Sequence, residues 1–235
     1  DSWILELIEK QKIDSVLNLA AGLDTRAYRL NLPSQLKWYD VDLPDILSYK
    51  ENALKDHRPS CKMEFVRMDL SNKNLRNELF SRVATTSQNT LVISEGFLMY
   101  LNREQAESLA ADLATYPQFK FWLAELLGPF QLAMIQRKWG HHFKAANAVM
   151  NFAPKEGPDC FKLQGWAPLG FKSIDELASA VSEGKTSMNK IKPIKPWFAL
   201  APPKKGFKRS TRKTYGEGGV LGQNKELVEL VRSMI

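Results

Sequence analysis

Cysteines are scarce in this sequence, and long apolar runs are absent. Only Cys61 and Cys160 occur among the 235 residues, with no C-x-x-C pair, so neither a disulfide framework nor a zinc-type site is indicated. No apolar run reaches the roughly 18–20 residues that a membrane span needs, and residues 1–10 mix apolar with charged side chains, unlike a signal peptide. These absences predict a soluble protein of the reducing cytoplasm, without a metal site or a membrane span.

Acidic residues are missing from one stretch, residues 185–213, which contains ten basic residues. Taking these ten from the 33 lysines and arginines leaves 23 against 26 acidic residues, so the rest of the chain carries −3 although the whole carries +7. Such a basic segment could bind RNA, an anionic membrane or an acidic substrate. It has few aromatic residues, so base stacking is not strongly indicated, and a solvated loop or strand pair is the simpler interpretation.

Short apolar runs alternate with helical patterns over the first two-thirds of the chain. Five runs are typical of buried strands: residues 15–20, 36–41, 64–68, 90–94 and 119–125. Between them, Pro44 begins a helix that reaches about Leu54, and Asn102 with Gln105 forms a capping-box pattern. The alternation predicts an α/β fold with a doubly wound, mostly parallel sheet and helices on both faces. The length fits a single domain over residues 1–235.

The patterns in other helices and after the fifth strand are less regular. The predicted apolar face of the helix at residues 44–54 consists of Ile46, Leu47, Tyr49 and Leu54. A long helix is predicted at about residues 130–150, a turn and strand at 165–171, a helix at 174–181 and a glycine-rich strand at 218–222. The region between the last two elements is interrupted by Pro193, Pro196, Pro202 and Pro203.

Function in an open α/β sheet concentrates at the carboxyl ends of its strands. The first predicted strand ends in Ala20, Ala21 and Gly22, small residues that let the backbone approach a ligand closely. Asp42 closes the second strand, where a carboxylate can accept hydrogen bonds from both hydroxyls of a ribose. Asp40 is the reserve for this role, because residues two apart share a strand face. An exposed acid before a helix start is the simpler explanation of Asp42.

Acids also follow the third and fourth strands. The carboxylate of Asp69 could accept the exocyclic amine of an adenine while the backbone N–H of Leu70 donates to a ring nitrogen, although Asp69 could equally cap a turn. Glu95 would lie in the crevice beside a cationic ligand, or pair with a nearby lysine or arginine. A small-residue turn followed by acids at successive strand ends is a rarer arrangement than any one of these features.

The segments NLAAGLDTRAYRL, WYDVDLPDILSYK, MDL and SEGFLMYL occur in this order between Val16 and Leu101. They resemble the signature blocks of the leucine carboxyl methyltransferase family, which belongs to the class I S-adenosyl-L-methionine (SAM)-dependent methyltransferases. The resemblance is looser after Glu125 and only general in the last third of the chain. It implies an O-methyltransferase that uses SAM and acts on a carboxylate or hydroxyl of a small molecule or protein.

The resemblance also implies roles for individual residues. The turn at residues 20–22 would contact the methionine part of SAM, and Asp42 would hold the two ribose hydroxyls. Asp69 and Leu70 match the family's Asp-Leu pair that binds the adenine of SAM. Glu95 matches the acid that lies near the amino acid end of the cofactor.

This chain departs from the family pattern in two places. Ala20 stands where many members have glycine, which fits only if the backbone there keeps a negative φ. Related proteins usually carry further helices before the first strand, including an arginine that meets the cofactor carboxylate, whereas only fourteen residues precede Ser15. Either the natural protein is longer, or the lid and the carboxylate partner come from elsewhere.

Two other functions remain as alternatives. An NAD(P)-dependent oxidoreductase shares the acid after a small-residue turn, but Thr25 stands at the third glycine of G-x-G-x-x-G, and Asp24 would oppose a pyrophosphate. An RNA-binding protein using residues 185–213 would show an affinity that falls steeply with salt and does not depend on SAM.

No residue is strongly indicated as catalytic. A carboxylate acceptor needs no general base, whereas a hydroxyl acceptor benefits from one. His141 and His142 lie on the predicted long helix, and since adjacent helical residues point about 100° apart, at most one would face a site. Tyr100 could contact the acceptor. For the histidines a surface position is the simpler interpretation, and for Tyr100 core packing.

Overall fold

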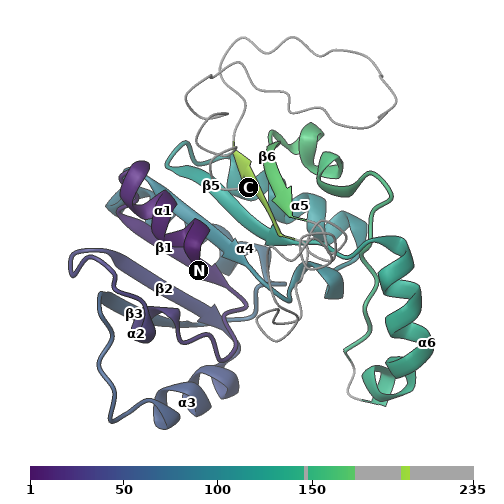
Figure 1. Cartoon of the computed structure of the whole chain (residues 1–235), viewed down its shortest axis with the longest axis horizontal. Coiled ribbons are helices and arrows are strands. Elements are labelled where there is room, and N and C mark those ends of the chain that lie inside the picture. Colours follow the sequence, from purple (N-terminus) through teal and green to yellow (C-terminus); the bar gives the residue numbers. More distant parts are fainter. Residues whose placement is uncertain (146–147, 173–196, 202–235) are drawn as a thin grey trace, which may run out of the picture.

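A computed structural model describes residues 1–145, 148–172 and 197–201, and Figure 1 shows their arrangement. Within these ranges the strands form one sheet in the order β3-β2-β1-β4-β5-β7-β6. The strands are β1 (Ser15–Leu19), β2 (Lys37–Asp42), β3 (Lys62–Arg67), β4 (Thr90–Ser94), β5 (Phe119–Glu125), β6 (Ala167–Lys172) and β7 (Trp197–Ala201). The helices are α1 (Ser2–Lys10), α2 (Arg26–Arg29), α3 (Pro44–Ala53), α4 (Lys73–Thr86), α5 (Arg103–Ala114) and α6 (Pro129–Ala145), with 3-10 helices η1 (Leu98–Tyr100) and η2 (Gly157–Gln164).

The order of the strands creates a reversal beside β1. Neighbours among β1 to β5 run parallel, whereas β7 runs antiparallel to both β5 and β6. The chain proceeds from β1 through β2 to β3 on one side, then returns to β4 next to β1 and continues to β5 on the other side. Ligands of open α/β sheets bind beyond the carboxyl ends of the strands at such a switch point.

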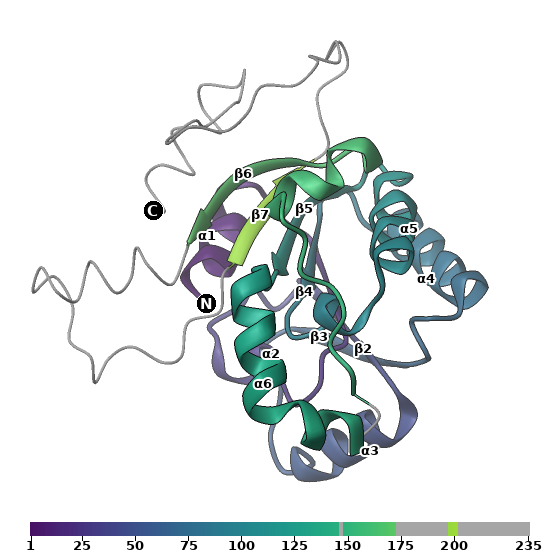
Figure 2. The same ribbon diagram turned by 90° about the vertical axis from the view of Figure 1, so that its right-hand side faces the viewer.

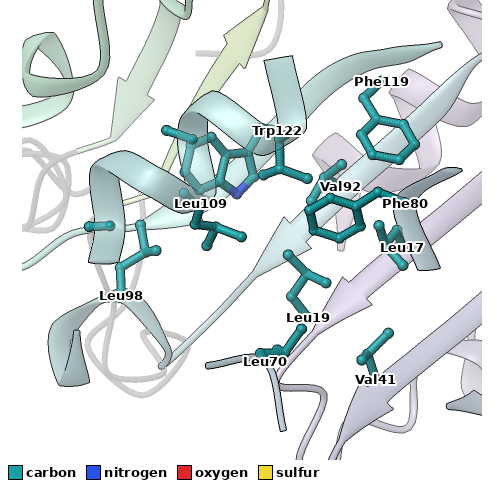
Figure 3. Close-up of a cluster of buried hydrophobic side chains, with 14 of the residues drawn as sticks. Leu17, Leu19, Val41, Leu70, Phe80, Val92, Leu98, Leu109, Phe119 and Trp122 are labelled. Atoms are coloured by element: carbon teal, nitrogen blue, oxygen red, sulfur yellow. The ribbon is translucent and has the colours of Figure 1, made fainter. Parts of the chain in front are cut away.

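Each face of the sheet has its own apolar layer, because successive strand residues point to opposite faces. Leu17 and Leu19 belong to the cluster shared with α4 and α5, whereas Val16 packs in the cluster shared with α1. Figure 2 shows α4 and α5 on one side of the sheet and α1 on the other. Figure 3 shows the first cluster, where Phe80 of α4 and Trp122 of β5 pack against the other strands. The predicted doubly wound α/β fold, with helices on both faces, is confirmed.

Most element boundaries also agree with the sequence. The predicted strands match β1 to β5 to within two residues, and Pro44 is the first residue of α3. The capping box of α5 is present: the side chain of Asn102 accepts the backbone N–H of Gln105, and the side chain of Gln105 accepts that of Asn102, both at 2.8 Å. Along the described ranges, no helix is long and apolar enough to cross a membrane.

Two expectations are wrong. The helix α3 buries Leu47 and Lys50, whereas Tyr49, predicted on its apolar face, is 65% exposed; the burial of Lys50 follows from its acidic partner on β2, given below. The second concerns the proline-rich region, where no strand was expected: β7 lies between Pro196 and Pro202 and pairs with the edge of β5. The expected helix at 174–181 and strand at 218–222 lie outside the described residues.

Candidate functional site

The turn after β1 is held against the end of β2. The backbone N–H of Ala21 donates to the carbonyl of Val41 at 3.1 Å, and that of Asp24 donates to the carbonyl of Ala21 at 3.0 Å. Ala20 and Gly22 have left-handed backbones, with φ of 51° and 49°. The expected negative φ at Ala20 is therefore wrong: the turn requires a conformation that costs a residue with a Cβ roughly 1–2 kcal/mol.

Ala20→Gly and Gly22→Ala should change stability in opposite directions. The first relieves left-handed strain, partly offset by the freedom of glycine in the unfolded chain, and should raise the free energy of unfolding by about 0.5–1 kcal/mol. The second introduces the strain and should lower it by about 1–2 kcal/mol, although a Cβ at Gly22 would meet no atom within 4 Å. Urea unfolding of both variants measures these changes. Two changes of the same sign would contradict the backbone argument.

Asp42 reaches from β2 to this turn. Its Oδ2 accepts the backbone N–H of Gly22 at 2.7 Å, and its Oδ1 accepts that of Leu43 at 2.7 Å. The residue is partly buried, so the carboxylate is held at the strand edge with one side open to solvent. The expected grouping of Gly22 and Asp42 in one place agrees with this contact, while the ribose role of Asp42 stays a prediction.

Asp69 and Leu70 lie at the adjacent strand end. The backbone N–H of Met68 donates to the carbonyl of Asp42 at 2.9 Å, which ties the ends of β2 and β3 together. Asp69 is exposed, and its Oδ1 accepts the backbone N–H of Ser71 at 2.8 Å, so it caps a turn. Leu70 is buried. Their adenine contacts stay a prediction.

Asp40, the reserve for the ribose role, lies in the core. Its side chain is 1% exposed and accepts hydrogen bonds from Nζ of Lys50, from Nε1 of Trp38 at 2.9 Å and from Nδ2 of Asn18 at 2.9 Å. Burial raises the pKa of Asp40, and Lys50, followed by the two neutral donors, counters part of that rise. The reserve assignment is wrong because α3 covers this carboxylate and supplies its cation.

A network of ion pairs joins the β1 turn to the end of β4. Nη2 of Arg26 donates to Oε2 of Glu95 at 2.7 Å, and Nη1 donates to Oδ2 of Asp24 at 2.9 Å. Nδ2 of Asn18 donates both to this Asp24 oxygen, at 3.0 Å, and to Asp40. Burial lowers the pKa of Arg26, but Asp24 and Glu95 more than offset this, so the pKa is raised. Glu95 therefore pairs with an arginine, which is the alternative role that the sequence allowed for it.

These partners were not expected from the sequence. Arg26, Asp24 and Asn18 all lie in the block NLAAGLDTRAYRL. Their place in this block was the one sequence feature that could have identified them as site residues. Glu125 was identified as the end of a strand. In the structure it is 1% exposed, and its Oε2 accepts the backbone N–H of Gly96 at 2.8 Å. Since Gly96 follows Glu95, this contact holds the loop that carries the acid.

The three weak catalytic candidates are exposed. His141 and His142 lie on α6, and their ring centroids are 3.8 Å apart. The two rings therefore lie against each other, contrary to the divergence expected of helix neighbours. Tyr100, in η1, is 38% exposed, so the simpler expectation of core packing is wrong for this residue. A catalytic role for any of the three stays a prediction.

Comparison with known proteins gives two different similarities. A putative S-adenosyl-L-methionine-dependent methyltransferase from Parafrankia sp. (strain EAN1pec) is 36% identical over 103 residues, covering 43% of this chain and 33% of that protein. Large ribosomal subunit protein uL30 from Nitrosopumilus maritimus (strain SCM1) is 63% identical over 67 residues, covering 28% of this chain and 43% of that protein. The chain thus spans less than half the length of these curated relatives.

Solved structures of other proteins share the fold of this chain. An O-methyltransferase family protein from Burkholderia thailandensis superimposes with a TM-score of 0.53 at 16% identity, covering 84% of this chain and 53% of that chain. This likeness shows a shared α/β fold. The family model described as leucine carboxyl methyltransferase matches residues 1–114, the part that contains the β1 turn, Asp42, Asp69 and Glu95. Over residues 1–114 the chain is similar to the leucine carboxyl methyltransferase family.

Proposed function

We propose that this chain is a SAM-dependent O-methyltransferase that transfers a methyl group to a carboxylate or hydroxyl of a small molecule or protein. The contact between Asp42 and Gly22 carries the proposal, because it sets an acid against a tight turn at the carboxyl edge of the sheet. The family match over the same residues supports SAM as the cofactor. The family's description as carboxyl methyltransferases supports an oxygen acceptor.

Each strand end would hold one part of the cofactor. A carboxylate has about four acceptor sites, and backbone N–H groups use two of those of Asp42, so two ribose hydroxyls fit beside them. Asp69 and Leu70, one strand further, would hold the adenine. The turn at residues 20–22 and Glu95 would flank the methionine part.

The reaction mainly requires the protein to position the acceptor oxygen against the methyl group of SAM. The methyl group of a sulfonium is already an activated electrophile: the acceptor oxygen forms the new O–C bond as the S–C bond breaks, and S-adenosylhomocysteine leaves. Holding the oxygen in line with that bond can contribute up to roughly 7–11 kcal/mol. His141, His142 and Tyr100 are candidates for a base only if the acceptor is a hydroxyl.

Calorimetric titration with SAM and with NAD tests the cofactor. We expect SAM to bind with a dissociation constant in roughly the micromolar range and NAD to give no heat of binding. Binding of NAD without SAM would replace the proposal with an oxidoreductase. Transfer of a radiolabelled methyl group to components of a cell extract then tests the acceptor. A methyl ester releases methanol in mild alkali whereas a methyl ether does not, and a methyl group found on nitrogen or carbon would contradict O-methylation.

We also propose that the basic segment, residues 185–213, binds RNA of the large ribosomal subunit. The similarity to uL30 over 67 residues carries this second function. The family model ends at residue 114, and residues 115–235 leave room for a match of that length, which we place over the ten basic residues. This placement competes with the prediction that one methyltransferase domain fills residues 1–235.

Neutralising part of the basic segment should weaken RNA binding and its salt dependence. Replacement of Lys204, Lys205, Lys208 and Arg209 by alanine should reduce the slope of log K against log salt by up to about 3, since each phosphate contact contributes about 0.7–0.9. Filter binding of large-subunit RNA at salt concentrations between about 50 and about 200 mM measures the slope of log K against log salt.

A matched control removes the same charge from the family-matched part. Lys55, Arg58, Lys62 and Lys73 are exposed, and their replacement by alanine should leave the slope unchanged. SAM affinity should be the same in both variants. Equal losses of RNA affinity in the two would indicate attraction by net charge and contradict a binding segment at residues 185–213.

A further inference from the structure

Arg76 is a buried arginine beside the loop that follows β3. It lies in the first turn of α4, and its side chain is 7% exposed. Its Nη1 donates to the backbone carbonyl of Leu70 at 2.9 Å. Its Nε donates to Oδ2 of Asp112 at 3.2 Å, and Nη2 donates to that oxygen as well. Nη2 also donates to Oγ of Ser108 at 3.2 Å. One guanidinium thus ties this loop to α5, which carries both side-chain partners.

The packing of α4 and α5 does not by itself require an arginine at this position. Phe80 of α4 and Leu109 of α5 belong to one buried apolar cluster, which Figure 3 shows. Replacing a buried ion pair with apolar residues of similar volume is often neutral or stabilising. An apolar side chain at position 76 would therefore serve the contact between the helices. It would not supply a donor for the carbonyl of Leu70.

The hydrogen bonds of this loop fix both peptide groups of Leu70. On one side, the carbonyl of Asp69 accepts the backbone N–H of Asn72 at 3.1 Å. On the other side, the carbonyl of Leu70 accepts from Arg76, and the backbone N–H of Ser71 donates to Oδ1 of Asp69 at 2.8 Å. The side chain of Leu70 is buried. Rotation about φ or ψ of Leu70 would break at least one of these bonds, so the direction of its N–H is set.

We propose that Arg76 is a positioning residue that sets the direction of the Leu70 N–H and thereby selects adenine over hypoxanthine, the deaminated base. This inference rests on the proposed function, in which this N–H donates to a ring nitrogen of adenine and Asp69 accepts the adjacent exocyclic amine. Hypoxanthine has a proton on that ring nitrogen and an oxygen in place of the amine. It would place donor against donor and acceptor against acceptor. A loop that cannot turn leaves these groups unpaired, and the wrong base is rejected.

Titration with S-adenosylhomocysteine and S-inosylhomocysteine tests this role, since hypoxanthine replaces adenine in the second ligand. The native chain should prefer the adenine ligand by about 100- to 1,000-fold. Arg76→Met should reduce this preference by about 10-fold, mainly by weakening the adenine ligand, because the carbonyl of Leu70 loses its donor. Arg76→Lys keeps a positive charge for Asp112, but one ammonium lacks the fork of a guanidinium. Its preference should fall between those of the native chain and Arg76→Met.

Two controls separate positioning from charge and from packing. Arg82→Met removes the same charge from α4: Arg82 is 47% exposed and pairs with Glu64, so the variant should keep the native preference. Leu113→Ala makes a cavity in α5, where Leu113 is fully buried. It should lower the free energy of unfolding and also keep the native preference. Urea unfolding shows which variants are folded.

The preference is a ratio within one protein, so a partly unfolded variant still gives a valid result. A native preference in Arg76→Met, or in Arg76→Lys if Arg76→Met does not fold, would overturn the role of Arg76. An equal loss of preference in Leu113→Ala would also overturn it, because general loosening would then explain the effect. Equal affinities of the native chain for the two ligands would overturn it and leave SAM as the cofactor. Failure of the native chain to bind either ligand would instead remove the methyltransferase proposal itself.

Discussion

Replacing Lys50 with methionine should lower the free energy of unfolding by about 3–5 kcal/mol. Lys50 and Asp40 are each 1% exposed and form an ion pair between α3 and β2. Methionine keeps most of the buried volume but leaves the carboxylate with its neutral donors, Trp38 and Asn18. A buried charge that has lost its counter-charge is far less stable than one in water. Urea unfolding at neutral pH measures the loss.

Two comparisons separate charge from packing. Lys73→Met removes a lysine that is 61% exposed and 3.6 Å from Asp112, and it should change stability by less than about 0.5 kcal/mol. The double variant Asp40→Asn/Lys50→Met removes both buried charges and should recover much of the loss. A double variant as unstable as Lys50→Met would attribute the effect to packing.

The loss should become smaller in acid. Burial raises the pKa of Asp40 in the native chain, and removal of Lys50 should raise it further. A carboxyl with a raised folded-state pKa contributes most stability below its unfolded pKa and loses that contribution as pH rises through the folded value. The stability difference between native chain and Lys50→Met should therefore narrow as pH falls from about 7 towards about 4. A constant difference would contradict a further rise of the Asp40 pKa in the variant.

Asp42→Ala should weaken SAM binding by about 1–3 kcal/mol, or roughly 5- to 150-fold. The reason is the loss of two ribose contacts that converge on one carboxylate. The backbone N–H groups of Gly22 and Leu43 hold this carboxylate in position, so little side-chain entropy is lost when the ribose binds. Calorimetric titration of the folded variant measures the change.

Asp45→Ala provides the control for this result. Asp45 lies in the first turn of α3 and is exposed, so its removal alters net charge by the same amount three residues away. We expect its SAM affinity to stay within about 2-fold of the native value. Since Asp42→Ala also removes the hydrogen bond from Gly22, urea unfolding must first show that the variant is folded. Unchanged affinity in a folded Asp42→Ala protein would take Asp42 out of the site.

The two acidic residues of β2 show how much of the site could be predicted from the sequence. Asp40 and Asp42 lie two residues apart on one strand face and both precede the Pro44 helix, so no local feature indicated that Asp40 would lie in the core. Their difference depends on Lys50, which α3 brings over Asp40 but not over Asp42. The favoured choice of Asp42 came from its position nearer the strand end, and it is the acid that contacts Gly22.

The backbone at Ala20 shows a second limit. A small residue at a strand end predicts a tight turn whatever its exact φ, and the turn is present. The sign of φ depends on how Ala21 is tied to Val41 of the neighbouring strand. That contact belongs to the sheet and has no counterpart in the local sequence.

The sequence by itself determined the strands β1 to β5, the helices α3 and α5 and the residues that close each of these strands. These features repeat locally, because burial on one or both faces imposes a period on the apolar residues and caps and prolines mark the ends. The tertiary structure decided which charges meet. Arg26 reaches Glu95 across 69 residues, and Asn18 reaches Asp40 across 22, because the order of β2, β1 and β4 in the sheet brings their ends together. Such pairings depend on strand order and register, and a one-dimensional pattern does not contain them.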